Sequence, residues 1–223
     1  CTPEKIPGSI WEGELLLKNI TVPGQVSWQT LLPVELDNLL VPVCLSSSHI
    51  GWGAIRLEPT WMALGEAAAW GCVLGARDKV VPASVKTDLL LRQLAEQRIM
   101  LSFFNDVEHE THANWYVAIQ YLGTKGYFGS YDALPEMPLR LQLAKAWARH
   151  TAARHRGELP NATAAGCLHW QAEMEGGEPI WASSFARLLD SACDTHHFTE
   201  QLPILAIDPT TFVNRANACR LIY

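Results

Sequence analysis

The order of apolar and polar positions divides the chain into a first part with strand-like patterns and a later part with helix-like patterns. Alternation within Gly13–Leu17 and Gln25–Trp28 predicts short strands near the start of the sequence. Residues 38–45 form an almost continuous apolar run, which predicts a buried, parallel strand. Pro42 lies within this run and favours a strand edge or end, because proline has no N–H for the ladder.

A turn of small residues, 46–58, follows the apolar run, and Pro59 then opens a predicted helix over residues 60–76. This helix is rich in alanine and glycine, which would let another backbone approach closely. A strand, a glycine-containing turn and a helix N-terminus in this order present backbone N–H groups to an anion or an electron-rich ring.

The later part of the chain predicts mainly helices. Helical periodicity appears in residues 84–97, 115–125 and 139–150, and a further helix contains Phe185–Leu189. Residues 203–207 predict a strand. The pattern therefore favours an α+β or α/β fold, with N-terminal strands and a strand-turn-helix unit followed by a mainly helical C-terminal region.

Composition restricts the class of protein. The 223 residues carry a formal net charge of −6 and are 48% hydrophobic, which is typical of a folded chain with its own core. Lysine and arginine do not cluster, so we expect no nucleic-acid partner. No apolar run reaches the length of a membrane span.

The cysteines and histidines do not predict a metal site. The six cysteines are widely spaced and contain no C-x-x-C pair. Cys167, His169, Cys193 and His196 could supply four zinc ligands, but the first spacing is too short for the common zinc fingers. The cluster of acids and histidines at 106–112 lacks the His-Glu-x-x-His pattern and favours a solvated loop. Two glycosylation sequons stand at Asn19 and Asn161.

Residues 28–69 contain a long ordered motif. They read, in sequence, L-L-P, D-N-L-L-V, C-x-S-x-S-H, I-R-x-x-P and M-x-L-G-x-A-A. This order resembles the C-terminal, flavin-proximal motif of a large bacterial family of FAD-dependent oxidoreductases, often labelled xanthan lyase-like. The resemblance implies that residues 1–80 are the C-terminal portion of a flavin-binding domain, in which the helix N-terminus lies against the isoalloxazine ring.

The resemblance also implies roles for particular residues. It implies contact with the flavin for Ser48, Arg56, Pro59, Thr60 and Met62, and catalytic roles for His49 and Arg56. Helix N-terminal amides and a nearby arginine stabilise negative charge on a reduced flavin. A histidine can relay a proton or contact substrate. The implied reaction is hydride transfer from an unidentified small-molecule or carbohydrate substrate to FAD.

One part of an FAD-binding protein is missing from the sequence. The G-x-G-x-x-G fingerprint that holds the ADP half occurs nowhere in the chain. We therefore expect FAD to require an N-terminal nucleotide-binding half that is absent here or carried by another chain, and this chain alone to be inactive. The start at Cys1 rather than Met is typical of a processed product or a C-terminal fragment.

A second resemblance lies in the later part, 81–223. The spacing from Phe104 through Trp115, Gly126 and Arg140 to Ala144 is similar to an S-layer-homology repeat, a module that binds cell-wall polysaccharide. The degenerate repeat spans about 103–150, one and a half copies are visible, and an irregular tail follows, so we expect a packing role. The aromatic residues from 115 to 131 could form a sugar platform, but their helical spacing favours the core.

These resemblances leave two functions open. The first is the C-terminal portion of an FAD-dependent oxidoreductase, and the second is a non-catalytic cell-envelope or carbohydrate-binding module. They do not fix the location of the protein, and they favour the bacterial periplasm or the extracellular space over the cytoplasm.

Overall fold

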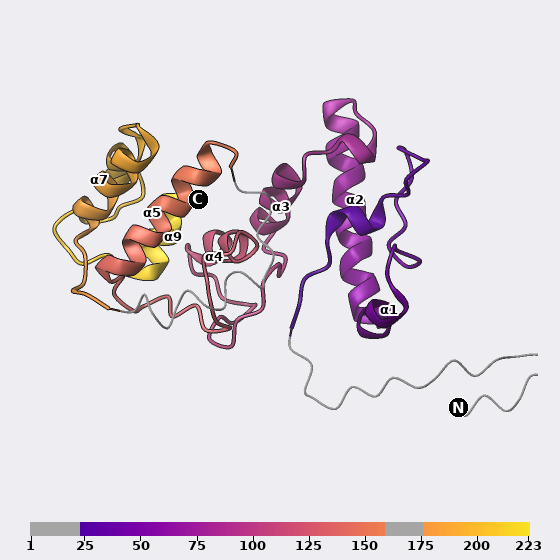
Figure 1. The fold of residues 1–223 in the computed structure, drawn as a ribbon, viewed down its shortest axis with the longest axis horizontal. Helices are drawn as coiled ribbons and strands as arrows, with labels where there is room; N and C mark the ends of the chain where they lie inside the picture. The colour runs from indigo at the N-terminus through magenta and orange to yellow at the C-terminus, as the bar shows by residue number, and fades with distance from the viewer. Residues whose placement is uncertain (1–22, 159–175) are drawn as a thin grey trace, which may run out of the picture.

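The computed structural model describes residues 23–158 and 176–223, which are mainly helical (Figure 1). The predicted strand at 13–17, both sequons and the pair Cys167 and His169 lie outside the described residues. The described part contains eight α-helices and two 3₁₀ helices: η1 (Trp28–Leu31), α1 (His49–Ile55), α2 (Glu58–Asp78), η2 (Pro82–Ser84), α3 (Thr87–Glu96), α4 (Tyr116–Gly123), α5 (Leu141–His155), α7 (Ala182–Cys193), α8 (His197–Ile204) and α9 (Arg215–Ile222).

The prediction of an α+β or α/β fold is wrong. In the described ranges no strand forms, and the β pairing consists of three isolated antiparallel bridges. The expected helices over 60–76, 84–97, 115–125, 139–150 and 185–189 are confirmed as α2, α3, α4, α5 and α7. The predicted strand at 203–207 is wrong, because it falls on the end of α8 and the turn that follows.

The apolar run at 38–45 forms no strand: it begins in a turn, bends at residues 42–44 and pairs with no other segment along most of its length. Val41 N–H donates to the carbonyl of Leu31 at 2.9 Å, and Ser46 N–H donates to that of Thr30 at 2.8 Å. Leu45 is buried, whereas Val43 is 44% exposed. Two bonds to a 3₁₀ turn replace a β-ladder here, since no extended neighbour lies alongside in the described residues.

Helix α2 is the main support of the N-terminal part. Pro59 lies in its first turn, and Lys79 ends the helix in the left-handed region at φ 57°. One side of α2 is buried with η1 and α3 in what we term the N-terminal cluster: Trp28, Leu31, Leu45, Leu64, Ala68, Leu74, Val85, Leu90 and Leu94.

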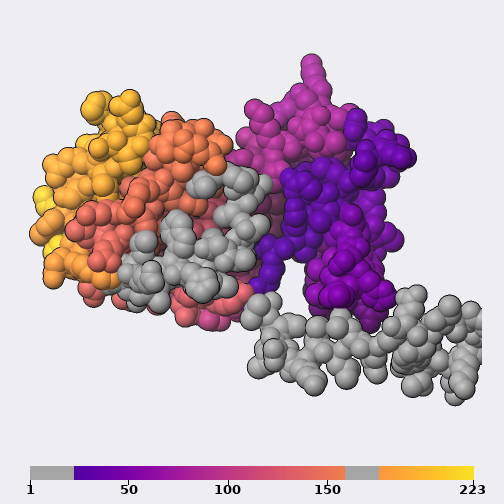
Figure 2. Space-filling view, in the orientation of Figure 1, coloured from indigo at the N-terminus to yellow at the C-terminus, as the bar shows by residue number. Residues whose placement is uncertain are grey.

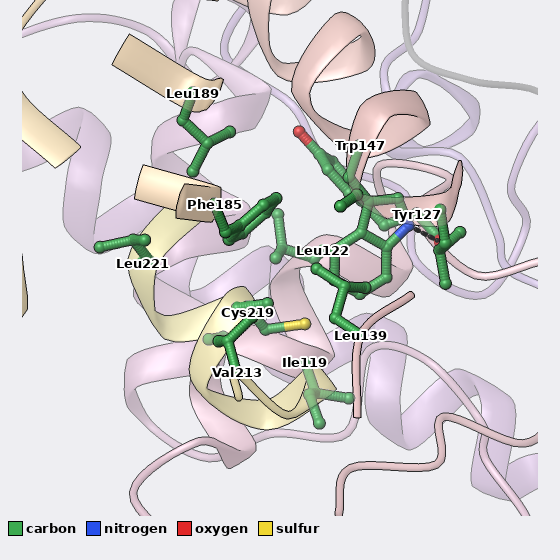
Figure 3. Packing of buried hydrophobic residues seen from close by; sticks show 14 of the residues in the cluster. Ile119, Leu122, Tyr127, Leu139, Trp147, Phe185, Leu189, Val213, Cys219 and Leu221 are labelled. Carbon is green, nitrogen blue, oxygen red and sulfur yellow. Dashed lines mark hydrogen bonds between the residues drawn. The ribbon is translucent and has the colours of Figure 1, made fainter. Parts of the chain in front are cut away.

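A larger C-terminal cluster joins α4, α5, α7, α8 and α9. Phe185, Trp147 and Leu122 pack together at its centre (Figure 3). The indole N–H of Trp147 donates to the carbonyl of Tyr127 at 2.9 Å, which satisfies a buried polar group. Of the aromatic residues from 115 to 131, four are buried, and the expectation of core packing is confirmed for them: Tyr116, Tyr121, Tyr127 and Phe128.

The three short segments that precede α5, α7 and α9 lie together and bond to one another. Leu139 N–H donates to the carbonyl of Val213 at 2.8 Å, Val213 to Ile180 at 3.0 Å, and Ile180 to Leu139 at 3.0 Å. These bonds close a ring, and all three side chains are buried. The three segments are therefore structurally equivalent, although only two of them, 137–139 and 178–180, share a proline before the buried apolar residue.

Helix α3 lies between the two hydrophobic clusters. Its Leu90 and Leu94 belong to the N-terminal cluster, whereas Ala95 belongs to the C-terminal cluster. Leu101, beyond the helix, packs against both. In the ribbon and space-filling views, the N-terminal helices and the C-terminal helices accordingly form two adjacent masses (Figures 1 and 2).

The fit of Trp28 against α2 is directly testable. A Cβ at Gly71 would lie 2.5 Å from Cη2 of the buried Trp28, whereas one at Gly65, also within α2, meets nothing within 4 Å. We expect Gly71→Ala to lower the free energy of unfolding by about 1–3 kcal/mol through overpacking. Gly65→Ala is the control and should raise it by about 0.5–1 kcal/mol. Urea unfolding measures both, and equal effects at the two positions would contradict the packing.

Candidate functional site

The corner between α1 and α2 carries the residues that the sequence singled out. The short helix α1, which the sequence did not predict, lies near the first turn of α2 (Figure 1). Trp52 of α1 stacks on Trp61 of α2, with 5.9 Å between ring centroids and 30° between planes. This contact fixes the corner, since only Arg56 and Leu57 separate the two helices.

The first turn of α2 presents backbone amides. Leu57 is the N-cap residue and offers no side-chain cap, so no side chain accepts from the first N–H groups in the described structure. Trp61 N–H already donates to the carbonyl of Leu57 at 3.0 Å. Pro59 has no N–H, which leaves the amides of Glu58 and Thr60 as the donors of this turn.

Arg56 stands at the C-cap of α1 and directly precedes the first turn of α2. Its side chain is exposed, and so is that of Glu58 in the first turn. Pro59 is exposed, Thr60 is half-buried, and Met62 is 75% exposed. The arrangement combines one cation with two amide donors at a positive helix end, and the acid of this first turn is Glu58.

Ser48 and His49 lie at the opposite end of α1. The hydroxyl of Ser48 accepts from the N–H of Gly51 at 3.1 Å and thereby caps the helix. His49 is the first residue of α1 and is exposed. Seven helical residues separate this end from Arg56, roughly 10 Å at the rise of an α-helix. The structure therefore groups Arg56, Pro59 and Thr60 and does not bring His49 to them.

An open groove in the described residues lies elsewhere, between α7 and α8. It has a volume of about 680 Å³ and is lined by polar side chains that include Arg187, Asp194 and Glu200. None of the predicted site residues lines it. Asp190 also lines the groove. Its carboxylate accepts hydrogen bonds from the N–H groups of Phe198 and Thr199 and so caps α8.

Within residues 23–158 and 176–223, no group of three or more histidine, cysteine, aspartate or glutamate side chains is arranged to hold a metal ion. None of the described helices combines the length and apolar character needed to cross a membrane.

The densest set of charges lies far from the α1–α2 corner in sequence. Asp88 of α3 pairs with Lys125 at 2.8 Å and receives a hydrogen bond from the Tyr121 hydroxyl at 2.6 Å. No pattern in the sequence singles out these residues, because Lys125 follows an apolar helix and has the pattern of an ordinary surface lysine.

Comparison with known proteins bears on the first part of the chain. Residues 15–96 match the family model of the FAD dependent oxidoreductases. This segment is part of an FAD-dependent oxidoreductase family domain, and it ends with α3. No curated protein and no solved structure matches the chain. The resemblance to S-layer-homology repeats finds no support, and the domain boundary near residue 80 stays a prediction.

The cap on α1 gives a test of the corner. We expect Ser48→Ala to destabilise α1 by about 1 kcal/mol, because Gly51 N–H loses its acceptor and a helix of seven residues is marginal alone. Amide hydrogen exchange at Gly51 should become about fivefold faster. Ser46→Ala, an exposed serine outside α1, is the control and should change nothing; equal exchange in both variants would count against the cap.

Proposed function

We propose that the first part of the chain completes the flavin site of an FAD-dependent oxidoreductase, with the first turn of α2 facing the ring system of FAD. The match of residues 15–96 carries this proposal. FAD, when bound, supplies the acceptor for a hydride from substrate. Arg56 and the amides of Glu58 and Thr60 would stabilise negative charge at the pyrimidine edge of the flavin.

The chemistry of the donors fits the ring end of FAD and not its nucleotide end. The α2 N-terminus lacks a side-chain cap and adjoins the exposed Arg56, which suits a group that gains negative charge. The sequence contains no G-x-G-x-x-G loop for the pyrophosphate. We therefore propose that a nucleotide-binding part outside these 223 residues, on the same polypeptide or on another chain, holds the rest of FAD.

The surface of the N-terminal part supports such a partner. Eleven of the eighteen exposed large apolar side chains in the described residues fall between Val34 and Leu89. On α2, Met62 and Val73 are more than half exposed and share one helical face with Ala69. Exposed apolar side chains concentrated in one region are typical of a surface that another part of a protein covers.

His49 remains a candidate for moving a proton or contacting substrate. Its exposure at the start of α1 suits the exchange of a proton with solvent. Because His49 and Arg56 lie at opposite ends of α1, we propose that the histidine does not share the role of Arg56 at the flavin. The hydroxyl of Ser48 accepts the N–H of Gly51, so Ser48 acts on the site by capping α1.

The charge of Arg56 provides the test. In the protein assembled with its nucleotide-binding part, we expect Arg56→Ala to lower the midpoint potential of the flavin by roughly 10–20 mV. This corresponds to about 0.5–1 kcal/mol for one exposed charge near a reduced ring. Spectroelectrochemical titration of the flavin absorbance measures the shift.

Arg77→Ala is the matched control. Arg77 is equally exposed but lies in the last turn of α2, where it pairs with Asp78 at 2.8 Å. It should leave the potential unchanged. An assembled protein that binds no flavin, or two variants with the same potential, would refute the proposal.

One observation favours the second candidate, a carbohydrate-binding module of the cell envelope. Trp181 and Phe212 stack at 4.3 Å beside the three-segment junction, and they are 47% and 50% exposed. Exposed aromatic faces suit the apolar faces of sugars. We propose this face as the one that would contact a glycan, in a protein of the periplasm or cell exterior.

For this candidate we expect Trp181→Ala to abolish retention of the chain on cell-wall polysaccharide in a pull-down. Phe103→Ala is the control, because Phe103 is 43% exposed and its ring contacts Tyr131 instead of Trp181 or Phe212. Failure of the unmodified chain to bind any such polysaccharide, or equal loss in both variants, removes the candidate.

A further inference from the structure

Four side chains converge on Asp88. Its Oδ1 lies 2.8 Å from Nζ of Lys125, 2.6 Å from the hydroxyl of Tyr121 and 3.7 Å from Arg154, while Oδ2 lies 3.3 Å from Nε of Arg92. Asp88 and Arg92 belong to α3, Tyr121 to α4 and Arg154 to α5, and Lys125 follows α4. One carboxylate on the N-terminal side thus receives bonds from two helical segments of the C-terminal side.

The ring of Tyr121 organises the same cluster. The guanidinium of Arg92 lies 4.4 Å from its centroid and 5.0 Å from that of Tyr223, and the two tyrosine rings meet edge to face at 5.2 Å. Arg92 also donates to the backbone oxygen of Tyr223 at 2.9 Å. The ammonium of Lys125 lies 5.0 Å from the Tyr121 ring. Cation–π contacts thereby add to the ion pairs across the same boundary.

Apolar packing across this boundary is limited on the α3 side. Leu90 and Leu94 face the N-terminal cluster. Toward the C-terminal cluster α3 contributes buried Ala95, with Leu91 only partly buried. A small side chain buries little area, so the charged cluster carries a large share of the contact between α3 and the C-terminal helices.

We propose that the Asp88 cluster is an electrostatic latch that fixes the C-terminal helices against α3, the last helix of the FAD-family segment. Asp88 is a positioning residue that acts through Lys125, Tyr121 and Arg92. The latch sets the orientation of the two clusters, and this inference does not depend on the function of either part.

Asp88 and Tyr121 keep their charge states over the ordinary pH range, whereas burial lowers the pKa of Lys125. Burial disfavours the ionised form of Asp88, but the hydrogen bonds from Lys125 and Tyr121 and the charges of Lys125 and Arg92 outweigh it and lower its pKa to about 2. Burial and the bond to Asp88 raise the pKa of Tyr121 to about 12. Because the pKa of Asp88 is depressed, its stabilisation is complete above the unfolded value near 3.8 and is lost as pH falls toward 2.

The test is Asp88→Asn in the full chain. The side chain of Lys125 is only 3% exposed, so removal of the carboxylate charge leaves a buried cation without its counter-charge. We expect differential scanning calorimetry to show one transition for the unmodified chain and two for the variant. Amide hydrogen exchange in α4 should rise at least about tenfold, which corresponds to about 1.4 kcal/mol.

Asp78→Asn is the matched control, because Asp78 pairs with the neighbouring Arg77 on an exposed surface of α2. It should keep one transition and change exchange in α4 less than about twofold. A single transition in Asp88→Asn, with exchange like that of the control, would overturn the latch.

A second variant covers the case in which Asp88→Asn does not fold. Arg92→Gln removes the stack on Tyr121 and Tyr223 while Lys125 keeps its partner. We expect this variant to fold and, like Asp88→Asn, to show two unfolding transitions in calorimetry. Unchanged calorimetry and exchange in Arg92→Gln would contradict the proposal.

Discussion

The burial of α3 on two sides is the constraint on which the arrangement of this chain depends. The helix gives Leu90 and Leu94 to the N-terminal cluster and Ala95 to the C-terminal one. Neither cluster can shift without exposing part of α3 or breaking the ion pair between Asp88 and Lys125. Because the FAD-family match ends with α3, the same helix joins the segment of known family to the helices beyond it.

The C-terminal helices have their own organising device. The ring of bonds among Leu139, Ile180 and Val213 starts three helices from one point and buries the three apolar side chains there. Each backbone N–H and carbonyl of the ring finds its partner in another segment, so the junction forms only when all three are present. It also brings Trp181 and Phe212 together on the surface.

The N-terminal part is built more sparsely. Its cluster is smaller than the C-terminal cluster, and many apolar side chains of residues 34–89 remain exposed. Its most defined local feature is the corner where Trp52 stacks on Trp61 and the uncapped α2 N-terminus follows Arg56. The helix end and the exposed apolar side chains around it belong to the part that we propose completes a flavin site.

Patterns within one helix were predictable from sequence, because they depend on neighbours three or four residues apart. The approximate extents of α2 to α5 and the proline start of α2 are of this kind. Residues 38–45 show the limit of such patterns: an apolar run has strand character only if another strand lies beside it, and here η1 offers two bonds instead.

Contacts between distant segments were decided by the tertiary structure alone. The third segment of the junction has Phe212 where the other two have proline, so its equivalence was hidden in the sequence. Lys125 is buried only because α3 brings Asp88 to it across 37 residues, and Arg92 reaches Tyr223 across 131. Local periodicity fixed which residues form helices, whereas the pairing of charges and the closing of backbone bonds between helices fixed how those helices meet.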